Sequence, residues 1–296
     1  MRIDGVFSGG GVKAYAFIGV MKRIEEEGLA FERVAGTSAG AIIASLLAAR
    51  YSYHDIRTLM EELNLKNLLD PPVITKWLPF TKWLFLYFQL GINKGNKLEG
   101  WIGEKLAVKH IYTFKDIHPD YLKVIASDIS LGKLVVIPDD LERIYGIPPE
   151  HFPVATAIRM SAGFPYFFMP KKLSGKNKTK SLMVDGGLLS NFPLWVFGED
   201  HNKRKRPVLG VKLSAASVHL KPRKIKTALA MFHALFLTMI EAHDSRYVSM
   251  SQANNIIFIP VENLESTDFN IDNDIKKKLI QAGYEQTSRF LRSWPR

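Results

Sequence analysis

Short apolar runs and longer amphipathic runs alternate along almost the whole chain. Runs rich in β-branched and aromatic residues predict strands at 3–7, 31–35, 121–127, 133–138, 181–184, 208–213 and 255–260. Helical spacing of apolar residues predicts helices at 14–27, 39–50, 53–63, 96–108, 153–162, 224–251 and 275–291. Without an internal repeat or a linker, this order predicts a single α/β domain over residues 1–296, with a sheet between helical layers.

Turn-forming residues refine this pattern. Ser52 and Asn96 are suited to cap the helices that follow them. The strands at 121–127 and 133–138 are close enough to form a hairpin. Residues 171–180 are polar, basic and contain glycine, so we expect a solvated loop there.

The segment at 71–95 departs from the alternation. Within it, residues 77–90 form a strongly apolar and aromatic run with Trp77 and Trp83, but this run also holds Pro79 and Lys82 and is too short to span a bilayer. One interpretation is a buried helical hairpin. The other is a flap that covers an apolar site or enters a membrane interface, where Trp is favoured. Aromatic surface beside basic charge favours the flap.

Composition limits the possible classes of protein. The chain has 296 residues, of which 47% are hydrophobic and 23% charged, so it can bury a substantial core. It has no cysteine, which excludes disulfides, cysteine ligands and a cysteine nucleophile. No secretory signal precedes the strand at 3–7, so we expect a cytoplasmic protein that can also attach peripherally to a membrane.

The net charge of +11 indicates attraction to anionic surfaces, either nucleic acid or acidic lipid. Basic clusters at 203–206 and 221–226 could bind phosphates. No motif that reads RNA or DNA accompanies them, so we expect solvated surface and no nucleic-acid partner.

The sequence Gly36-Thr37-Ser38-Ala39-Gly40 joins a predicted strand to a predicted helix. Glycines two residues on either side of Ser38 allow a tight turn that leaves the hydroxyl exposed, as in the G-x-S-x-G nucleophile elbow. The helix N-terminus would favour developing negative charge beside it. Alternatively, Ser38 only caps the helix. A base and an oxyanion hole elsewhere in the chain would favour the nucleophile.

Gly9, Gly10 and Gly11 follow the first predicted strand, with Lys13 close by. Amide groups without a Cβ can converge there on a phosphate or on the oxyanion of an acyl intermediate. A loose dinucleotide fingerprint, Gly9-x-Gly11-x-x-Ala14, is the alternative. That motif needs an acidic residue at the end of the second strand, whereas Glu32 lies near its start. An oxyanion loop therefore fits better.

Asp185-Gly186-Gly187 follows the apolar strand at 181–184. The strand delivers a carboxylate to its own end, and the glycines leave room for another group to approach it. The alternative is a turn aspartate that binds only its own backbone amides. On its own, this motif does not decide between the two.

The order of these three motifs resembles the patatin-like phospholipase family. The stretches Ser161-Ala162-Gly163-Phe164-Pro165 and Asn191-x-Pro193 also resemble that family, and the likeness covers residues 1 to about 260. It implies a three-layer α/β/α fold with a mostly parallel sheet. Many members have a glycine where this chain has Ala14, and this difference bears on how closely the backbone of the glycine loop packs. The segment at 71–95 matches nothing general to the family.

The resemblance implies a Ser–Asp dyad that hydrolyses fatty-acyl esters of phospholipids or related lipids at a membrane or micelle surface. Ser38 would be the nucleophile, Asp185 the base, and Gly9, Gly10 and Gly11 the oxyanion loop. Lys13, Gly36, Gly40, Gly186 and Gly187 would support them. The chemistry requires no metal or cofactor, and none of the eight histidines lies in these motifs. The competing hypothesis is a non-enzymatic lipid- or phosphate-binding protein on a hydrolase scaffold.

Overall fold

The computed structural model describes residues 1–77, 86–176, 180–198, 206–214, 225–250, 253–261 and 264–294. In this part of the chain an eight-stranded sheet has the order β10-β9-β1-β2-β4-β8-β7, and β5 also pairs with β4. The strands are β1 (Arg2–Phe7), β2 (Ala30–Thr37), β4 (Leu122–Asp128), β5 (Lys133–Ile137), β7 (Lys171–Ser174), β8 (Lys180–Asp185), β9 (Val208–Ser214) and β10 (Ile256–Pro260). The pairs among β10, β9, β1, β2 and β4 are parallel, whereas β5, β8 and β7 pair antiparallel. The predicted mostly parallel sheet is confirmed.

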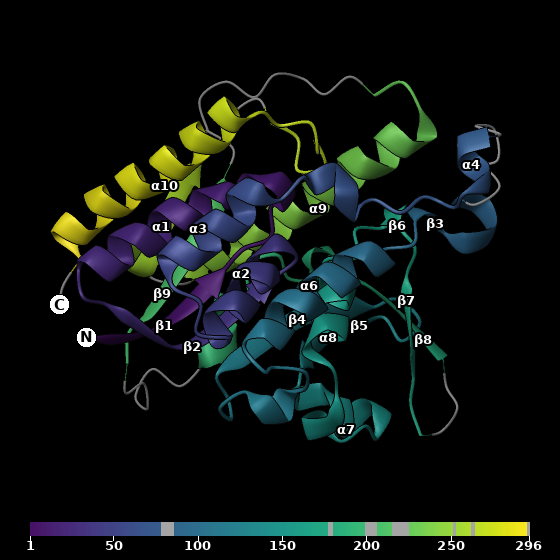
Figure 1. Cartoon of the computed structure of the whole chain (residues 1–296), viewed down its shortest axis with the longest axis horizontal. Coiled ribbons are helices and arrows are strands. Elements are labelled where there is room, and N and C mark those ends of the chain that lie inside the picture. The colour runs from purple at the N-terminus through teal and green to yellow at the C-terminus, as the bar shows by residue number, and fades with distance from the viewer. Residues whose placement is uncertain are drawn as a thin grey trace.

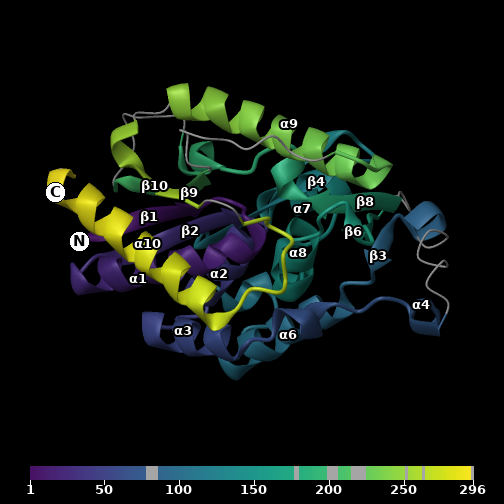
Figure 2. The same ribbon diagram turned by 90° about the horizontal axis from the view of Figure 1, so that it is seen from above.

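Helices cover both faces of this sheet (Figures 1 and 2). One face carries α1 (Tyr15–Glu26), α2 (Ala39–Ala48), α3 (Tyr53–Glu62), α6 (Asn96–Val108) and α10 (Asn273–Ser293). The other carries α9 (Ala228–Met250). Three shorter helices are α4 (Ile74–Trp77), α7 (Asp139–Tyr145) and α8 (Val154–Ser161). The three-layer α/β/α arrangement agrees with the predicted fold class.

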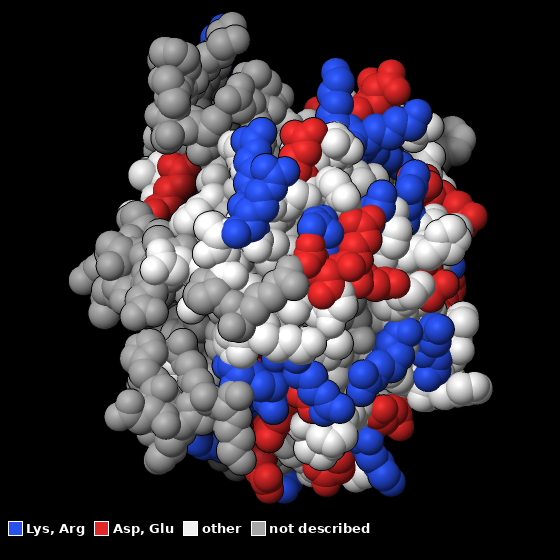
Figure 3. All heavy atoms as spheres, turned by 90° about the vertical axis from the view of Figure 1, so that its left-hand side faces the viewer, with Lys and Arg blue, Asp and Glu red and all other residues white. Residues whose placement is uncertain are grey.

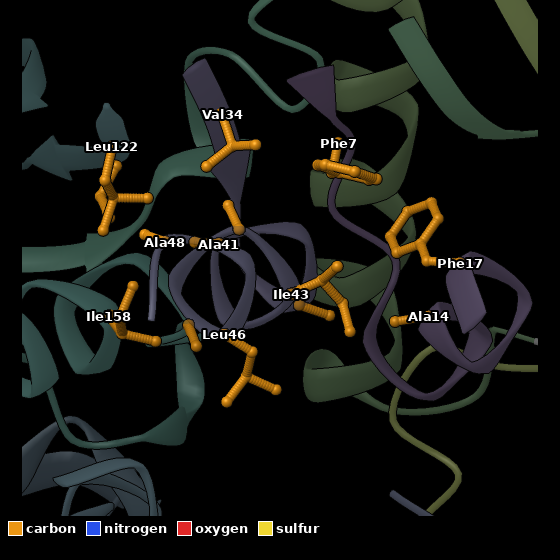
Figure 4. Packing of buried hydrophobic residues seen from close by; sticks show 14 of the residues in the cluster. Phe7, Ala14, Phe17, Val34, Ala41, Ile43, Leu46, Ala48, Leu122 and Ile158 are labelled. Atoms are coloured by element: carbon orange, nitrogen blue, oxygen red, sulfur yellow. The ribbon is translucent and has the colours of Figure 1, made fainter. Parts of the chain in front are cut away.

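The core lies between the sheet and α2. Almost every residue of α2 is apolar, which suits a helix enclosed on all sides. Its side chains, among them Ala41, Ile43 and Leu46, pack against those of β1, β2, β4, α1 and α8. Figure 4 labels these three together with Phe7, Phe17, Val34, Leu122 and Ile158 of the neighbouring elements. Each fully buried Ile, Leu or Phe contributes about 1.5–3 kcal/mol. This packing fixes the start of α2, where the site lies.

The expected solvated loop at 171–180 is partly wrong. Residues 171–174 form β7, which pairs antiparallel with β8. Leu173 points into the core, while its neighbours Lys172 and Ser174 are exposed. Lysines are common on such edge strands because they discourage pairing with another chain. The polar composition therefore reflects an edge strand, and residues 177–179 lie outside the described residues.

The expectation that Asn96 caps the start of α6 is also wrong, because Asp70 takes this role. Asp70 accepts hydrogen bonds from the backbone N–H groups of Gly95 at 2.5 Å, Asn96 at 2.7 Å and Lys97 at 3.1 Å, so its carboxylate caps α6 from a distant part of the chain. Ser52 caps α3 as expected, with Asp55 completing a capping box.

Between Asp70 and α6 runs the aromatic segment predicted at 71–95. Its described residues include α4, a helical turn at 86–89 and β3 (Gly91–Asn93), which pairs with β6 (Tyr166–Phe168). Trp77, Tyr87 and Phe88 are 83%, 77% and 73% exposed. These side chains are therefore not in a buried hairpin. The rest of the predicted flap, 78–85, lies outside the described residues.

In the described portion, none of the helices combines the length and apolar character that crossing a bilayer requires.

Candidate active site

Ser38 lies at the sharp turn between β2 and α2. Its backbone is left-handed, with φ 54° and ψ −124°, a strained conformation typical of a nucleophile elbow. Its N–H donates to the Ser161 hydroxyl at 2.9 Å, and that hydroxyl donates to the Ile125 carbonyl at 2.5 Å. Within the described residues the Ser38 side chain makes no hydrogen bond that caps α2. The interpretation of Ser38 as a simple cap is therefore wrong.

Close backbone packing explains the two glycines of the elbow. A Cβ added to Gly36 would lie 2.4 Å from the backbone of Gly40, and a Cβ on Gly40 would lie 2.4 Å from the Phe7 carbonyl oxygen. A side chain at either position would push α2 away from β1 and β2. Both residues thus hold the elbow in shape from beneath.

Asp185 ends β8 and is only 3% exposed. Its carboxylate accepts a hydrogen bond from the N–H of Gly187 at 2.8 Å, and the Ser38 side chain lies close enough to lower its pKa. Burial raises the pKa of this carboxyl to about 6, and the contacts with Gly187 and Ser38 counter only part of that rise. The backbone N–H of Asp185 donates to the Gly163 carbonyl at 2.9 Å, which fixes the residue in place.

The turn after Asp185 allows this approach. The Gly187 hydrogen bond is the geometry expected of a turn aspartate, and the Ser38 contact is added to it. A Cβ on Gly186 would lie 2.3 Å from the Ile125 carbonyl oxygen of β4. The glycine pair therefore lets the turn pack closely beneath the site.

The glycine loop lies directly beside Ser38. A Cβ on Gly9 would lie 3.3 Å from the Ser38 Cβ, but the Gly9 N–H is already donated to the Asn191 carbonyl at 3.0 Å. In the described part of the chain, the N–H groups of Gly10, Gly11 and Ala39 have no hydrogen-bond partner. These three residues line the same cavity as Ser38 and Asp185, as does Lys13 in the 3₁₀ turn Gly11–Ala14.

The dinucleotide alternative lacks its acidic partner. β1 and β2 are parallel, with Arg2 opposite Ala30 at one end and Phe7 opposite Gly36 at the other. Glu32 therefore lies at the end of the sheet away from the glycine loop, where it forms a 3.2 Å ion pair with Arg2. It cannot bind a ribose at the loop.

A buried polar network ties the glycine loop to α9. Asp244 of α9, 4% exposed, accepts hydrogen bonds from Lys212 at 2.6 Å and from the Asn191 side chain at 3.1 Å. Asn191 in turn contacts Gly9 through its backbone carbonyl, and its Oδ1 would lie 2.3 Å from a Cβ at Gly9. Asn191 thus connects the position of α9 to the loop beside Ser38.

Ser38 and Asp185 line a cavity of about 540 Å³ that is mainly apolar. Aliphatic side chains of α2, α3 and α6 form one part of the wall: Ile42, Ile43, Met60 and Leu98. Aromatic rings form another: Phe164, Phe167, Phe168, Phe236 and Phe269. This size and lining suit an extended apolar ligand whose polar end lies at Ser38.

The structure brings Ser38, Asp185, Lys13 and the three loop glycines together around this cavity, with the other four glycines packed behind them. No histidine lines it in the described part of the chain. Among the same residues, no group of three His, Cys, Asp or Glu side chains is placed to hold a metal ion.

Sequence reasoning missed three supporting residues. Ser161 and Asn191 belong to recognised motifs, but only the fold reveals that they contact Ser38 and Gly9. Asp244 lies in a long helix without any motif, so only the structure could identify it.

Comparison with known proteins gives the family. A family described as Patatin-like phospholipase matches residues 5–197. The uncharacterized protein YqhO of Bacillus subtilis is 45% identical over 294 residues, 99% of each chain. An uncharacterized NTE family protein of Mycobacterium bovis, Mb1092c, is 24% identical over 65% of this chain and 44% of its own.

Two solved structures share the fold. VipD from Legionella pneumophila aligns with a TM-score of 0.60 at 19% identity, over 99% of this chain and 67% of its own. ExoU, from the type III secretion system of Pseudomonas aeruginosa, aligns with a TM-score of 0.51 at 18% identity, over 98% of this chain and 51% of its own. These structures share the fold, and the match over residues 5–197 shows that the chain belongs to the patatin-like phospholipase family.

Proposed function

We propose that this protein is a serine hydrolase that cleaves fatty-acyl ester bonds of phospholipids or related lipids, in the manner of a phospholipase A. Membership of the patatin-like phospholipase family supports lipid hydrolase activity. The observation that carries the finer proposal is the position of Ser38 beside the buried Asp185 at the wall of a largely apolar cavity.

In the proposed acylation step, Asp185 takes the proton of the Ser38 hydroxyl as Oγ attacks the ester carbonyl carbon. The carbonyl π electrons move to oxygen, and the resulting oxyanion accepts hydrogen bonds from the N–H groups of Gly10, Gly11 and Ala39. Each such donor supplies about 2.7–4 kcal/mol in other acyl-transfer enzymes. When the intermediate collapses, the C–O bond to the alcohol breaks and Asp185 returns the proton to the leaving oxygen.

Water completes the cycle. Asp185 removes a proton from the water as the water oxygen attacks the carbonyl carbon of acyl-Ser38. The C–O bond to Ser38 then breaks, Oγ regains a proton from Asp185, and the fatty acid leaves. A pKa near 6 suits this dual role, because the carboxyl is largely ionised at neutral pH yet basic enough to accept a proton. No histidine is required.

The cavity supports a long acyl chain as the part of the substrate that is bound. Its walls present methyl, methylene and aromatic groups over most of their extent, and Ser38, Asp185 and the loop glycines line the same cavity. Such a chain resides in a membrane or micelle, so we propose that the protein acts as a cytoplasmic enzyme that attaches peripherally to lipid.

The test compares native protein with Ser38→Ala on a mixed lipid extract, with products identified by mass spectrometry. Ser293→Ala is a matched control, since Ser293 is exposed at the end of α10. Native protein and the control should release free fatty acid and the matching lysolipid or alcohol, and Ser38→Ala should not. Equal release by all three would contradict the proposal. Lipid binding without release by native protein would favour the non-enzymatic scaffold.

A further inference from the structure

Helix α9 presents one side to the cavity. Phe236, Ile240 and Asp244 follow each other at helical spacing and all line it. The Phe236 ring packs edge-on against Phe164 at 4.8 Å between centroids. Together with the ion pair from Asp244 to Lys212, this contact anchors the inner side of α9 over the site.

The opposite side of α9 is also apolar but is exposed. Met231, Leu235 and Met239 are 54%, 55% and 45% exposed, and their spacing of four residues places them on one stripe. From Ala228 to Ile240 the sequence contains no Asp, Glu, Lys or Arg. We call Met231, Leu235 and Met239 the outer stripe. A helix covered with apolar side chains on its solvent side marks an interaction surface.

A second exposed apolar feature lies at the same end of the molecule. Trp77, Tyr87 and Phe88, the aromatic tip, lie in and after α4 and are among the most exposed apolar side chains of the described residues. In both Figure 1 and Figure 2, α4 and the beginning of α9 lie at the end opposite the two termini. Trp and Tyr are the residues that membranes favour at their interface.

Exposed lysines accompany these apolar groups. Lys226 is exposed just before α9, and Lys172, Lys176 and Lys180 are exposed on β7, in the turn that follows it and on β8, which Figure 1 also places at this end. By contrast, the face on the other side of the molecule mixes Lys and Arg with Asp and Glu (Figure 3). Apolar groups flanked by lysines complement an anionic lipid surface.

We propose that the outer stripe and the aromatic tip form the surface by which this protein binds an anionic phospholipid membrane, with α9 lying between the membrane and the cavity. The choice of lipid as the occupant rests on the proposed function. The same helix then contacts the lipid aggregate on one side and lines the site on the other. Hydrolysis at a membrane would therefore depend on residues that never touch the reacting ester.

The experiment measures co-sedimentation with vesicles of phosphatidylcholine, with and without phosphatidylserine. It uses the full chain carrying Ser38→Ala, so that binding is measured without hydrolysis. Leu235→Glu and Met239→Glu test the stripe, and Trp77→Glu tests the tip. Val108→Glu is a matched control, because Val108 is 69% exposed at the end of α6. Thermal melting verifies that each variant is folded.

We expect binding to vesicles that contain phosphatidylserine, about tenfold or more weaker for each stripe or tip variant and unchanged for Val108→Glu. On the active background, the same variants should lose hydrolysis of vesicles and retain hydrolysis of a soluble short-chain ester. Equal binding by all folded variants would overturn the inference. So would a native dimer that Leu235→Glu dissociates without weakening vesicle binding. Binding by inactive native protein would uphold this surface while contradicting the proposed function.

Discussion

The Ser38 side chain lies close enough to the carboxylate of Asp185 to lower its pKa, and Asp185 ends a strand separated from that of Ser38 only by β4. The strained elbow fixes one partner, and the end of a buried strand fixes the other. The geometry thus pre-organises a nucleophile and a base without a histidine.

The first prediction concerns Asp185→Asn. The amide keeps an oxygen that can accept from the Gly187 N–H, but it cannot take a proton from Ser38. We expect kcat/KM for an acyl ester to fall about 10³-fold or more, nearly as far as for Ser38→Ala. The double variant should lose little beyond either single one, because the two residues act as a unit. Near-normal turnover by Asp185→Asn would show that another group is the base.

The pH dependence follows from the raised pKa. Asp185 must be ionised to accept the Ser38 proton, and its pKa in the folded protein is about 6. We therefore expect kcat/KM for an uncharged soluble ester to be nearly constant above pH 7 and to fall about tenfold per pH unit below pH 6. Stopped assays between pH 4.5 and 8.5 measure this profile. A fall that begins only below pH 4 would contradict the assignment.

As the pH rises, the free energy of unfolding should fall while activity increases. The pKa of Asp185 is raised on folding from about 3.8 to about 6, so folding favours the protonated carboxyl. Below pH 4 the neutral carboxyl costs the folded protein nothing. As the pH rises through 6 the buried carboxyl ionises, and above pH 6 this charge lowers the free energy of unfolding by about 3 kcal/mol. Asp185→Asn removes this cost. We expect it to be more stable than native protein at pH 8, by up to that amount in urea unfolding.

The pH series provides the internal control for this stability prediction. The advantage of Asp185→Asn should shrink steadily as the pH is lowered from 7 towards 4, since the native carboxyl then becomes neutral as well. An advantage independent of pH, or a destabilised variant at pH 8, would mean that the buried charge is not the source.

Asp244 should act on the reaction from a distance, by positioning Asn191 beside Gly9. Asp244→Asn removes the charge that pairs with Lys212 and weakens the hold on the Asn191 side chain. We expect kcat to fall about 10- to 100-fold with a smaller change in KM, since a displaced loop misplaces the oxyanion donors. His243→Gln, exposed on the same helix, is the control and should be unaffected. Equal kcat for both variants would limit Asp244 to a structural role.

Much of this fold could be predicted from local patterns. The alternation of short apolar runs with helical ones gave the sheet and its covering helices, and the hairpin of β4 and β5 was predicted with its strands. The motifs of Ser38 and Asp185 each predict a functional group at a strand end, and the resemblance to the patatin-like phospholipase family is what pairs the two residues. β8 runs antiparallel to β4 and ends with Asp185 opposite Ala126, and this arrangement beside β2 is not written in either motif.

The features that escaped prediction depend on long-range contacts. β3 and β6 are three residues each and pair across the distant positions Gly91 and Tyr166, so neither has a strand signal of its own. The polar residues of β7 predict a loop because its lysines face solvent at the sheet edge. The Gly9 N–H is not a free donor because it bonds to the Asn191 carbonyl, and only the folded chain brings these two residues together.

The most direct measurement of the central claim is reaction of the folded protein with a fluorophosphonate probe, followed by peptide mass mapping. An activated serine should form a single adduct, on Ser38, and Asp185→Asn should label at least about 100-fold more slowly. An unlabelled native protein, or an adduct on any other residue, would contradict the account.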